Sequence, residues 1–271
     1  MLDCNTPNSQ CYNLHDNLLD GVKKITSIPV TILTVAFNAE KTIARTIESV
    51  IKQSYENIEY LVIDGASSDN TVSIANSYLE KFNAIPGRSM KIISEPDKGM
   101  YDALNKGARL AHGEIIGQIN ADDYYEPDAV QTMAELYERE HYDLAWGSIN
   151  VITKNGNIIK HAKKGLLWTT SHWCHPAAFA SRKILLEYPY PLINSHDDFD
   201  FATHVYLDGK KIMPVDKVIS NFTFGGMSTQ KSFREAKKRL DEIYGIYKKY
   251  GMSKLYYLHR LIFETVKYIL T

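Results

Sequence analysis

Residues 30–55, VTILTVAFNAEKTIARTIESVIKQSY, join two patterns that together favour an α/β fold. The first eight residues are apolar and β-branched almost without interruption, which is typical of a strand buried on both faces. Residues 39–55 then place Ile43, Ile47 and Ile51 at helical spacing. A buried strand followed directly by an amphipathic helix is the unit from which parallel sheets are built.

The same alternation continues to about residue 135. We predict further strands over 58–65, 90–97 and 113–123, with helices over 68–82, over 99–111 and from near Pro127. Strands that alternate with short helices predict a parallel sheet with helices on both faces, and ligands bind beyond the carboxyl ends of such strands. The predicted strands end in polar or acidic residues, namely Phe37-Asn38, Asp64-Gly65, Glu95-Pro96-Asp97 and Asp122-Asp123. We therefore predict a ligand site at this edge.

After about residue 140 the pattern changes. Residues 142–165 predict a hairpin that turns at Asn155-Gly156, and the chain becomes mostly helical and basic after Gly226. We predict an N-terminal leader over 1–28, an α/β domain over 29–225 whose pattern changes after residue 135, and a basic helical extension over 226–271. The Gly-Gly in residues 225–230 favours a loop that closes over a bound ligand.

Composition excludes several classes of protein. A net charge of −1 over 271 residues gives no overall field for binding nucleic acid. The three cysteines, Cys4, Cys11 and Cys174, lack metal-ligand spacing and favour a cytoplasmic protein. Residues 1–24 lack the pattern of a signal peptide, and no run approaches the roughly 20 apolar residues of a membrane span.

Asp122-Asp123 is the most informative acidic pair. Such a pair often caps a helix or lies in a solvated loop, but this one follows a buried strand at the predicted ligand edge. Carboxylates there suit a divalent cation, Mn²⁺ or Mg²⁺, that also binds a diphosphate. Neither G-x-G-x-x-G after the first strand nor G-x-x-x-x-G-K-[ST] is present, which argues against a Rossmann dehydrogenase and a P-loop nucleotidase.

The stretches VTILTVAFNAEKTIARTIESVIKQSYENIEYLVIDGASSDNT and SEPDKGMYDALNKGARLAHGEIIGQINADDYYEPDA resemble the bacterial family 2 glycosyltransferases. The resemblance covers residues 29–135 and resumes at HPAAF (175–179) and HDDFDF (196–201). It implies a GT-A fold, with a mixed, mainly parallel central sheet flanked by helices and a C-terminal helical extension. It also implies a metal-dependent, inverting transfer from a nucleotide-diphospho-sugar, usually a UDP-sugar, to an acceptor hydroxyl. On this resemblance residues 29–225 form the catalytic domain, with a nucleotide-sugar half (29–135) and an acceptor half (136–225).

The resemblance assigns roles to individual residues. Phe37 falls where the family places an aromatic ring against the base, and Asp64 aligns with the acid that accepts a hydrogen bond from uracil. Asp123 is the expected metal ligand, although this chain has A-D-D where the motif is named D-x-D. The full set implied for nucleotide-sugar binding is Phe37, Asn38, Glu40, Asp64, Asp97, Lys98, Asn105 and Asp122.

A second acidic pair, Asp197-Asp198, would supply the base that an inverting transfer needs on the acceptor side. The family usually has Glu-Asp here, so the resemblance assigns Asp198 as the base and Asp197 as its partner. Both acids could instead cap a helix that starts near Phe199. We expect Asp200 on the surface of that helix.

Two parts of the second half keep alternative interpretations. His175 and Trp173, with Trp168 and His172 nearby, either contact the acceptor or belong to the core. Residues 231–270 combine lysines, arginines and helically spaced leucines. They either rest on an anionic membrane or pack on the catalytic domain or on a second subunit of an oligomer.

The sequence therefore predicts a cytoplasmic glycosyltransferase at the inner face of the bacterial membrane. Its acceptor would be a lipid-linked oligosaccharide of a surface polysaccharide such as O-antigen, capsule or exopolysaccharide. A nucleotidyltransferase acting on sugar phosphates is one alternative, but AFNAEKTI (36–43) lacks the Gly-rich, basic loop expected after its first strand. A non-catalytic sugar-binding protein is the other alternative.

Overall fold

The computed structural model describes residues 28–154, 156–163, 173–223 and 233–270. The first half contains β1 (Val30–Ala36), α1 (Ile43–Ile51), β2 (Ile58–Asp64), α2 (Thr71–Asn76), α3 (Leu79–Asn83), β3 (Arg88–Ser94), α4 (Met100–Leu110) and β4 (Ile115–Asn120). There follow β5 (Tyr124–Tyr125), α5 (Ala129–Glu140), β6 (Leu144–Thr153), β7 (Gly156–Lys160), a 3₁₀ turn (His175–Ala177), β8 (Ala178–Ser181), α6 (Arg182–Glu187), α7 (Asp197–Leu207), β9 (Ile212–Thr223), α8 (Phe233–Lys249) and α9 (Lys254–Leu270).

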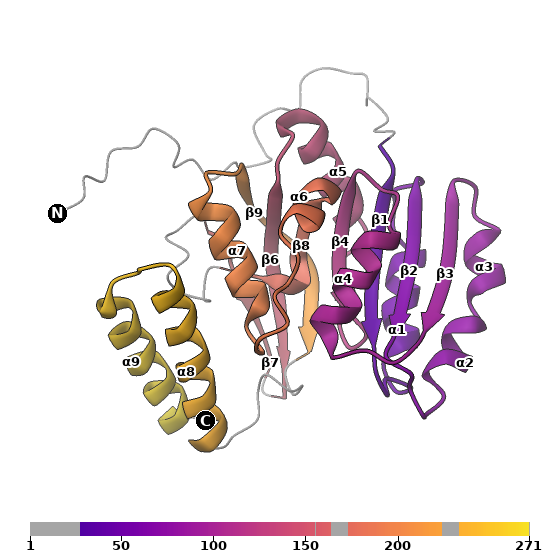
Figure 1. The fold of residues 1–271 in the computed structure, drawn as a ribbon. Helices are drawn as coiled ribbons and strands as arrows, with labels where there is room; N and C mark the ends of the chain where they lie inside the picture. The colour runs from indigo at the N-terminus through magenta and orange to yellow at the C-terminus, as the bar shows by residue number, and fades with distance from the viewer. Residues whose placement is uncertain (1–27, 155, 164–172, 224–232, 271) are drawn as a thin grey trace.

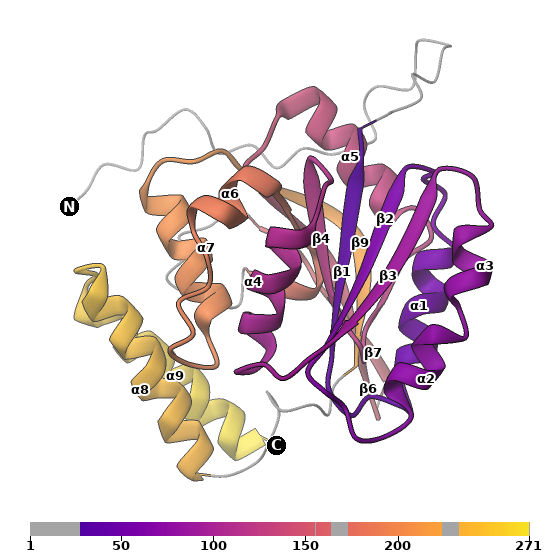
Figure 2. The same ribbon diagram turned by 45° about the vertical axis from the view of Figure 1, so that its right-hand side comes forward.

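In the described residues one sheet of nine strands runs in the order β3-β2-β1-β4-β8-β6-β9-β5, with β7 beside β6. The strands β3, β2, β1 and β4 are parallel, β8 is antiparallel to both of its neighbours, and β6 is parallel to β9. In Figures 1 and 2 the strands β1–β3 lie between α4 on one side and α1–α3 on the other. This mixed α/β sheet confirms the predicted fold class.

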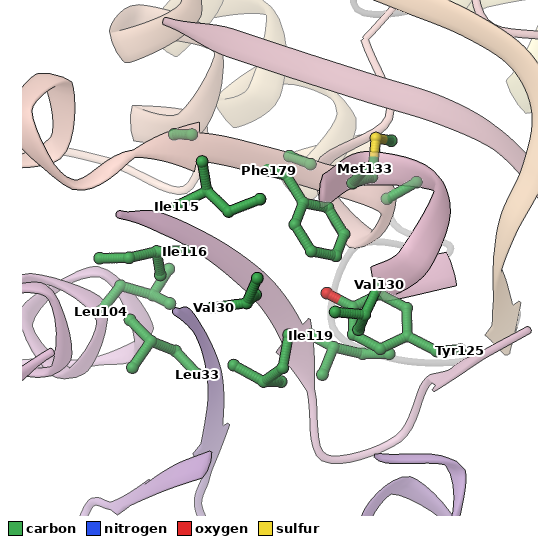
Figure 3. Close-up of a cluster of buried hydrophobic side chains, with 14 of the residues drawn as sticks. Val30, Leu33, Leu104, Ile115, Ile116, Ile119, Tyr125, Val130, Met133 and Phe179 are labelled. Atoms are coloured by element: carbon green, nitrogen blue, oxygen red, sulfur yellow. The ribbon is translucent and has the colours of Figure 1, made fainter. Parts of the chain in front are cut away.

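The strand β4 shows why these runs are apolar on both faces. Ile115, Ile116 and Ile119 are all buried, although successive side chains of a strand point to opposite faces. Figure 3 shows them with Leu33 of β1, Leu104 of α4, Val130 and Met133 of α5, and Phe179 of β8. Gly117 is required for this packing, because a Cβ there would lie 2.5 Å from Cε1 of Phe179.

Several predicted boundaries are wrong by a few residues. The helix predicted over 68–82 is two short helices, α2 and α3, and the hydroxyl of Ser77 between them donates to the carbonyl of Ile74. The strand predicted over 113–123 ends at Asn120, which leaves both aspartates in the turn before β5. The helix expected near Pro127 begins at Ala129. The hairpin prediction is confirmed by the antiparallel β6 and β7, although Asn155 lies outside the described residues.

The C-terminal helix α8 packs against α7 of the α/β domain. Phe199 of α7 forms a buried cluster with Ile243, Ile246 and Tyr247 of α8. The prediction that Asp200 lies on the helix surface is wrong, because α8 covers it and Nζ of Lys249 donates to both of its carboxylate oxygens. Among the described residues no helix is long and apolar enough to cross a membrane. The leader at 1–27 and the predicted closing loop at 225–230 lie outside the described residues.

Candidate active site

The four polar strand ends lie at one edge of the sheet. The register pairs Ala36 with Asp64 and Asp64 with Ser94, and it pairs Val35 with Asn120. The arrows of β1, β2 and β3 accordingly point to the same lower edge in Figure 1. The chain segments that follow these strands therefore begin side by side, as parallel pairing requires.

The loop after β1 is tied to the loop after β2. Asn38 adopts a left-handed backbone (φ 50°), donates its N–H to Oγ of Ser67, and accepts the N–H of Ser68 at its side-chain oxygen. Glu40 accepts the backbone N–H of Asn70. Phe37 remains 66% exposed at this edge. An exposed aromatic ring on a loop held so firmly has the geometry for stacking on a flat ligand.

Asp64 organises the loop from beneath. It is fully buried and accepts hydrogen bonds from N–H and Oγ of Ser67 and from Oγ of Ser94. A hydrogen bond from uracil would have to join or replace these, so that role stays a prediction. The Asp97 carboxylate accepts the N–H of Gly99 and lies over Gly65, where a Cβ would approach Oδ2 of Asp97 to 2.7 Å. The side chain of Lys98 is exposed at the start of α4.

The turn holding Asp122 and Asp123 is fixed by α1 and β9. Nη2 of Arg45 donates to the backbone oxygen of Asp122 at 2.6 Å, and the hydroxyl of Thr46 donates to the backbone oxygen of Asp123 at 2.6 Å. The N–H of Thr223, at the end of β9, donates to Oδ1 of Asp123 at 3.0 Å. The backbone of both aspartates and Oδ1 of Asp123 are thus held by elements far apart in the sequence.

The second carboxylate oxygen of Asp123 indicates a cation site. Oδ2 is buried, and within the described residues it has no hydrogen-bond partner. Burial, and then the charge of Asp122, raise the pKa of Asp123 to about 8. Burial also raises the pKa of Asp122. An ionised carboxylate is costly when it is buried without a donor for one oxygen, so the group either holds a proton or binds a cation in the place of that proton.

The donor set fits Mn²⁺ or Mg²⁺ bound through few protein ligands. The described part of the chain holds no group of three or more His, Cys, Asp or Glu placed to bind a metal. Mg²⁺ commonly takes one or two carboxylates and completes its shell with water and substrate phosphates. The orphaned oxygen of Asp123 therefore fits a cation that arrives with a diphosphate.

Asp198 is held by two donors from other elements. Oη of Tyr101 on α4 donates to Oδ1 at 2.8 Å, and Nε1 of Trp173 donates to Oδ2 at 2.8 Å. Asp197 is buried and accepts the backbone N–H groups of Ile193 and Asn194 in the loop before α7. The helix begins at Asp197 rather than near Phe199, and no side chain caps it. Both acids nevertheless lie in the first turn of α7, where negative charge stabilises a helix, so the helix-capping alternative stays open beside the catalytic one.

The side chains predicted on the acceptor side are mostly used inside the protein. Trp173 is buried against Trp146, with ring centroids 5.2 Å apart, so its ring faces are covered and it acts on Asp198 through its indole N–H. His175 is buried, and Nε2 lies 3.0 Å from Oε1 of Gln118. Burial lowers the pKa of His175, and the charge of Asp198 partly opposes this. Trp168 and His172 lie outside the described residues.

Asn105 behaves similarly. Its side-chain amide donates to the backbone oxygen of Tyr190 and accepts the backbone N–H of the same residue, both at 2.9 Å. The hydroxyl of Tyr190 in turn donates to Gln118 on β4 at 2.7 Å. Asn105 is buried with these two bonds in place, although its amide keeps a second N–H and a second lone pair. Asn105 in this structure joins α4 to the loop before α7.

Sequence reasoning missed four residues that hold the acids: Arg45, Thr46, Tyr101 and Thr223. Tyr101 carried a usable signal, since it lies in the first turn of a helix that starts at the ligand edge. Thr223 carried none, because it is 100 residues from Asp123 in the chain. Their roles appear only once the sheet is assembled.

Solved structures of other proteins share this fold. S. aureus TarS (residues 1–349, in complex with UDP-GlcNAc) superposes with a TM-score of 0.64 at 19% identity, over 79% of this chain and 64% of that one. The Pyrobaculum calidifontis mannosyltransferase PcManGT, in complex with GDP-Man and Mn²⁺, gives a TM-score of 0.62 at 18% identity, over 82% and 64%. The chain has the GT-A fold of these nucleotide-sugar transferases.

The family follows from the sequence. The model of the family described as "Glycosyl transferase family 2" matches residues 31–194, and the chain belongs to this family. Escherichia coli chondroitin synthase is 30% identical over 136 residues, which are 49% of this chain but 19% of that protein. A PGL/p-HBAD biosynthesis glycosyltransferase of Mycobacterium tuberculosis (strain H37Rv) is 28% identical over 216 residues, which are 78% of this chain and 83% of that protein. The chain thus spans only part of several relatives.

Proposed function

We propose that the protein is a metal-dependent, inverting glycosyltransferase that moves a sugar from a UDP-sugar to a hydroxyl of a glycan acceptor. The observation that carries the proposal is the buried, unpartnered Oδ2 of Asp123 at the carboxyl edge of the sheet. UDP-GlcNAc and GDP-Man in the TarS and PcManGT structures support a nucleotide-sugar donor, and Mn²⁺ in PcManGT supports the cation.

In this proposal the donor lies across the strand ends. The exposed ring of Phe37 stacks on the base, above the loop held by Asn38, Glu40 and Asp64. Asp97, Lys98 and Asp122 line the ribose and the diphosphate. Asp123 holds Mn²⁺ or Mg²⁺, which when bound supplies positive charge to the leaving diphosphate.

Asp198 is the proposed base. The acceptor oxygen forms a bond to the anomeric carbon while the bond from that carbon to the diphosphate oxygen breaks. The electron pair of the broken bond leaves with the nucleoside diphosphate, and the acceptor proton passes to Asp198. Attack on the face opposite the leaving group inverts the anomeric configuration. Tyr101 and Trp173 keep the carboxylate in place for this transfer, and Asp197 fixes the start of α7.

We further propose that the acceptor is a lipid-linked oligosaccharide of a bacterial surface polysaccharide, such as O-antigen, capsule or exopolysaccharide, and that transfer takes place in the cytoplasm. Likeness to chondroitin synthase and to a PGL/p-HBAD biosynthesis glycosyltransferase supports a glycan or glycolipid product.

The test is nucleotide release across a panel of UDP- and GDP-sugars with Mn²⁺, followed by calorimetry of UDP binding. We expect Asp123→Asn to weaken Mn²⁺-dependent UDP binding and abolish turnover. We expect Asp198→Asn to bind UDP normally and to lose about 10²- to 10⁴-fold in kcat. Asp241→Asn, an exposed change on α8, serves as the control. Near-normal turnover of Asp198→Asn would remove the base assignment, and unchanged UDP binding by Asp123→Asn would remove the metal assignment.

A further inference from the structure

The C-terminal helices α8 and α9 have different surroundings. Figure 1 shows α8 between α7 and α9. Phe199 of α7 packs against Ile243 and Tyr247 of α8, and Lys249 pairs with Asp200. The helix α9 packs on α8 through Tyr244 and Tyr257, whose ring centroids are 4.8 Å apart. The helix α8 is thus packed on the α/β domain, and α9 forms a further layer outside α8.

The outward face of α9 is apolar. Leu255 is 71% exposed, Leu258 50%, Leu261 37% and Ile262 58%. Residues at intervals of three and four share one face of a helix, so these side chains form a continuous row. Arg260, by contrast, is buried. Among the described side chains, this helix therefore exposes three leucines and an isoleucine to solvent and buries a cation, the reverse of a helix that simply covers a core.

Positive charge surrounds this row. Residues 233–270 contain nine Lys and Arg against four Asp and Glu, while the whole chain has a net charge of −1. Lys237 and Lys248 are exposed on α8, and Lys254 is exposed at the start of α9. Tyr244, itself 37% exposed, shares the side of α8 that carries both lysines and borders α9. The exposed apolar side chains of α9 therefore lie next to the contact between Tyr257 and Tyr244, and the exposed lysines of α8 lie beyond that contact.

We propose that this face of α9 binds the surface of an anionic lipid bilayer, with the helix axis in the plane of the interface. Amphipathic helices bind in this way when apolar side chains enter the acyl boundary and lysines meet anionic headgroups. Charge complementarity favours a bilayer over a second copy of the chain, because pairing two identical faces would bring their lysines together. The binding does not depend on sugar transfer; its use, bringing the site to a lipid-linked acceptor, rests on the proposed function.

The test is co-sedimentation of the full chain with vesicles of phosphatidylcholine alone or mixed equally with phosphatidylglycerol. We expect binding only to the anionic vesicles, and we expect it to weaken with salt. Leu258→Glu/Ile262→Glu should abolish it, and Lys237→Glu/Lys248→Glu should weaken it at least about tenfold. Ile158→Glu on β7 is the matched control, since Ile158 is also 63% exposed, and it should bind as wild type does.

The circular dichroism spectrum and the affinity for UDP should be the same in all variants as in the wild type. These controls show whether the fold and the donor site are intact, and they separate this proposal from the catalytic one. Wild-type binding by Leu258→Glu/Ile262→Glu would overturn the proposal. So would a dimer in analytical ultracentrifugation that this double variant dissociates while wild type ignores both kinds of vesicle.

Discussion

Tyr101→Phe removes one hydroxyl and tests how Asp198 is held. The hydroxyl lies 2.8 Å from Oδ1 of Asp198 and 3.1 Å from the backbone oxygen of Ser195. One proton cannot serve both acceptors, and the shorter bond to a carboxylate is the stronger. The ring stays in place in the variant, because it packs on Tyr190 with centroids 5.1 Å apart.

A hydrogen bond to a charged group contributes about 1.5–3 kcal/mol, which corresponds to about 10- to 150-fold in rate. Asp198 is only half-buried and keeps its bond from Trp173, so we expect the lower end, about tenfold, in kcat. The donor KM should change little, because Tyr101 contacts Asp198 and not the strand ends where the donor is proposed to bind.

Steady-state transfer assays over a range of donor concentrations measure kcat and the donor KM. Tyr60→Phe is the control, since Tyr60 is a buried tyrosine whose hydroxyl donates to Thr34 inside the sheet. A variant with wild-type kcat would refute the assignment. A rise in donor KM at constant kcat would also refute it, because Tyr101 would then act on donor binding.

Three further changes test other contacts. Gly65→Ala should weaken UDP-sugar binding about tenfold in calorimetry with little loss of stability, because its Cβ would displace the Asp97 carboxylate; Gly245→Ala on α8, with open space around it, should do neither. Asp200→Asn should lower Tm by about 3–6 °C in a thermal scan through loss of about 1–2 kcal/mol from the ion pair between α7 and α8, and an unchanged Tm would show that this pair contributes nothing. Burial lowers the pKa of His175, so the folded state excludes a proton that the unfolded chain takes up below about pH 6.5. Stability should therefore fall with pH below that value, and in urea unfolding the advantage of wild type over His175→Gln should shrink between pH 7.5 and pH 5.5; a constant difference contradicts this.

The parallel half of the fold could be predicted because its signals are local. Each strand of that half is a short apolar run, and each helix carries its own periodicity. The break between α2 and α3 was missed, because Ser77 acts through a hydroxyl bond that competes with the helix and leaves no mark on the apolar pattern. Asp200 was misplaced for a different reason: its partner Lys249 belongs to a helix that packs on α7 only after folding.

The candidate site shows the same limit. The acids at the strand ends could be found because a strand ends where its apolar run ends. What holds each acid could not, since Thr46, Thr223, Tyr101 and Trp173 come from four different elements. For Trp173 the sequence left two interpretations open, contact with the acceptor or a place in the core. Packing on Trp146 places the ring in the core, and its indole N–H donates to Asp198.

The helix α4 joins the two halves of the proposed chemistry. It starts beside Asp97 at the donor edge, contacts Asp198 through Tyr101 in its first turn, and one turn later binds the backbone of Tyr190 through Asn105. A helix is stiff over three turns, so a donor that shifts its first turn must also shift the carboxylate held there. The proposed base Asp198 and Asp97, which is proposed to line the diphosphate, are therefore both held at the start of one rigid element, although 101 residues separate them in the sequence. A substitution at Asn105 that frees α4 from the backbone of Tyr190 should therefore disturb the position of Asp198, although neither Asp97 nor Asp198 is changed.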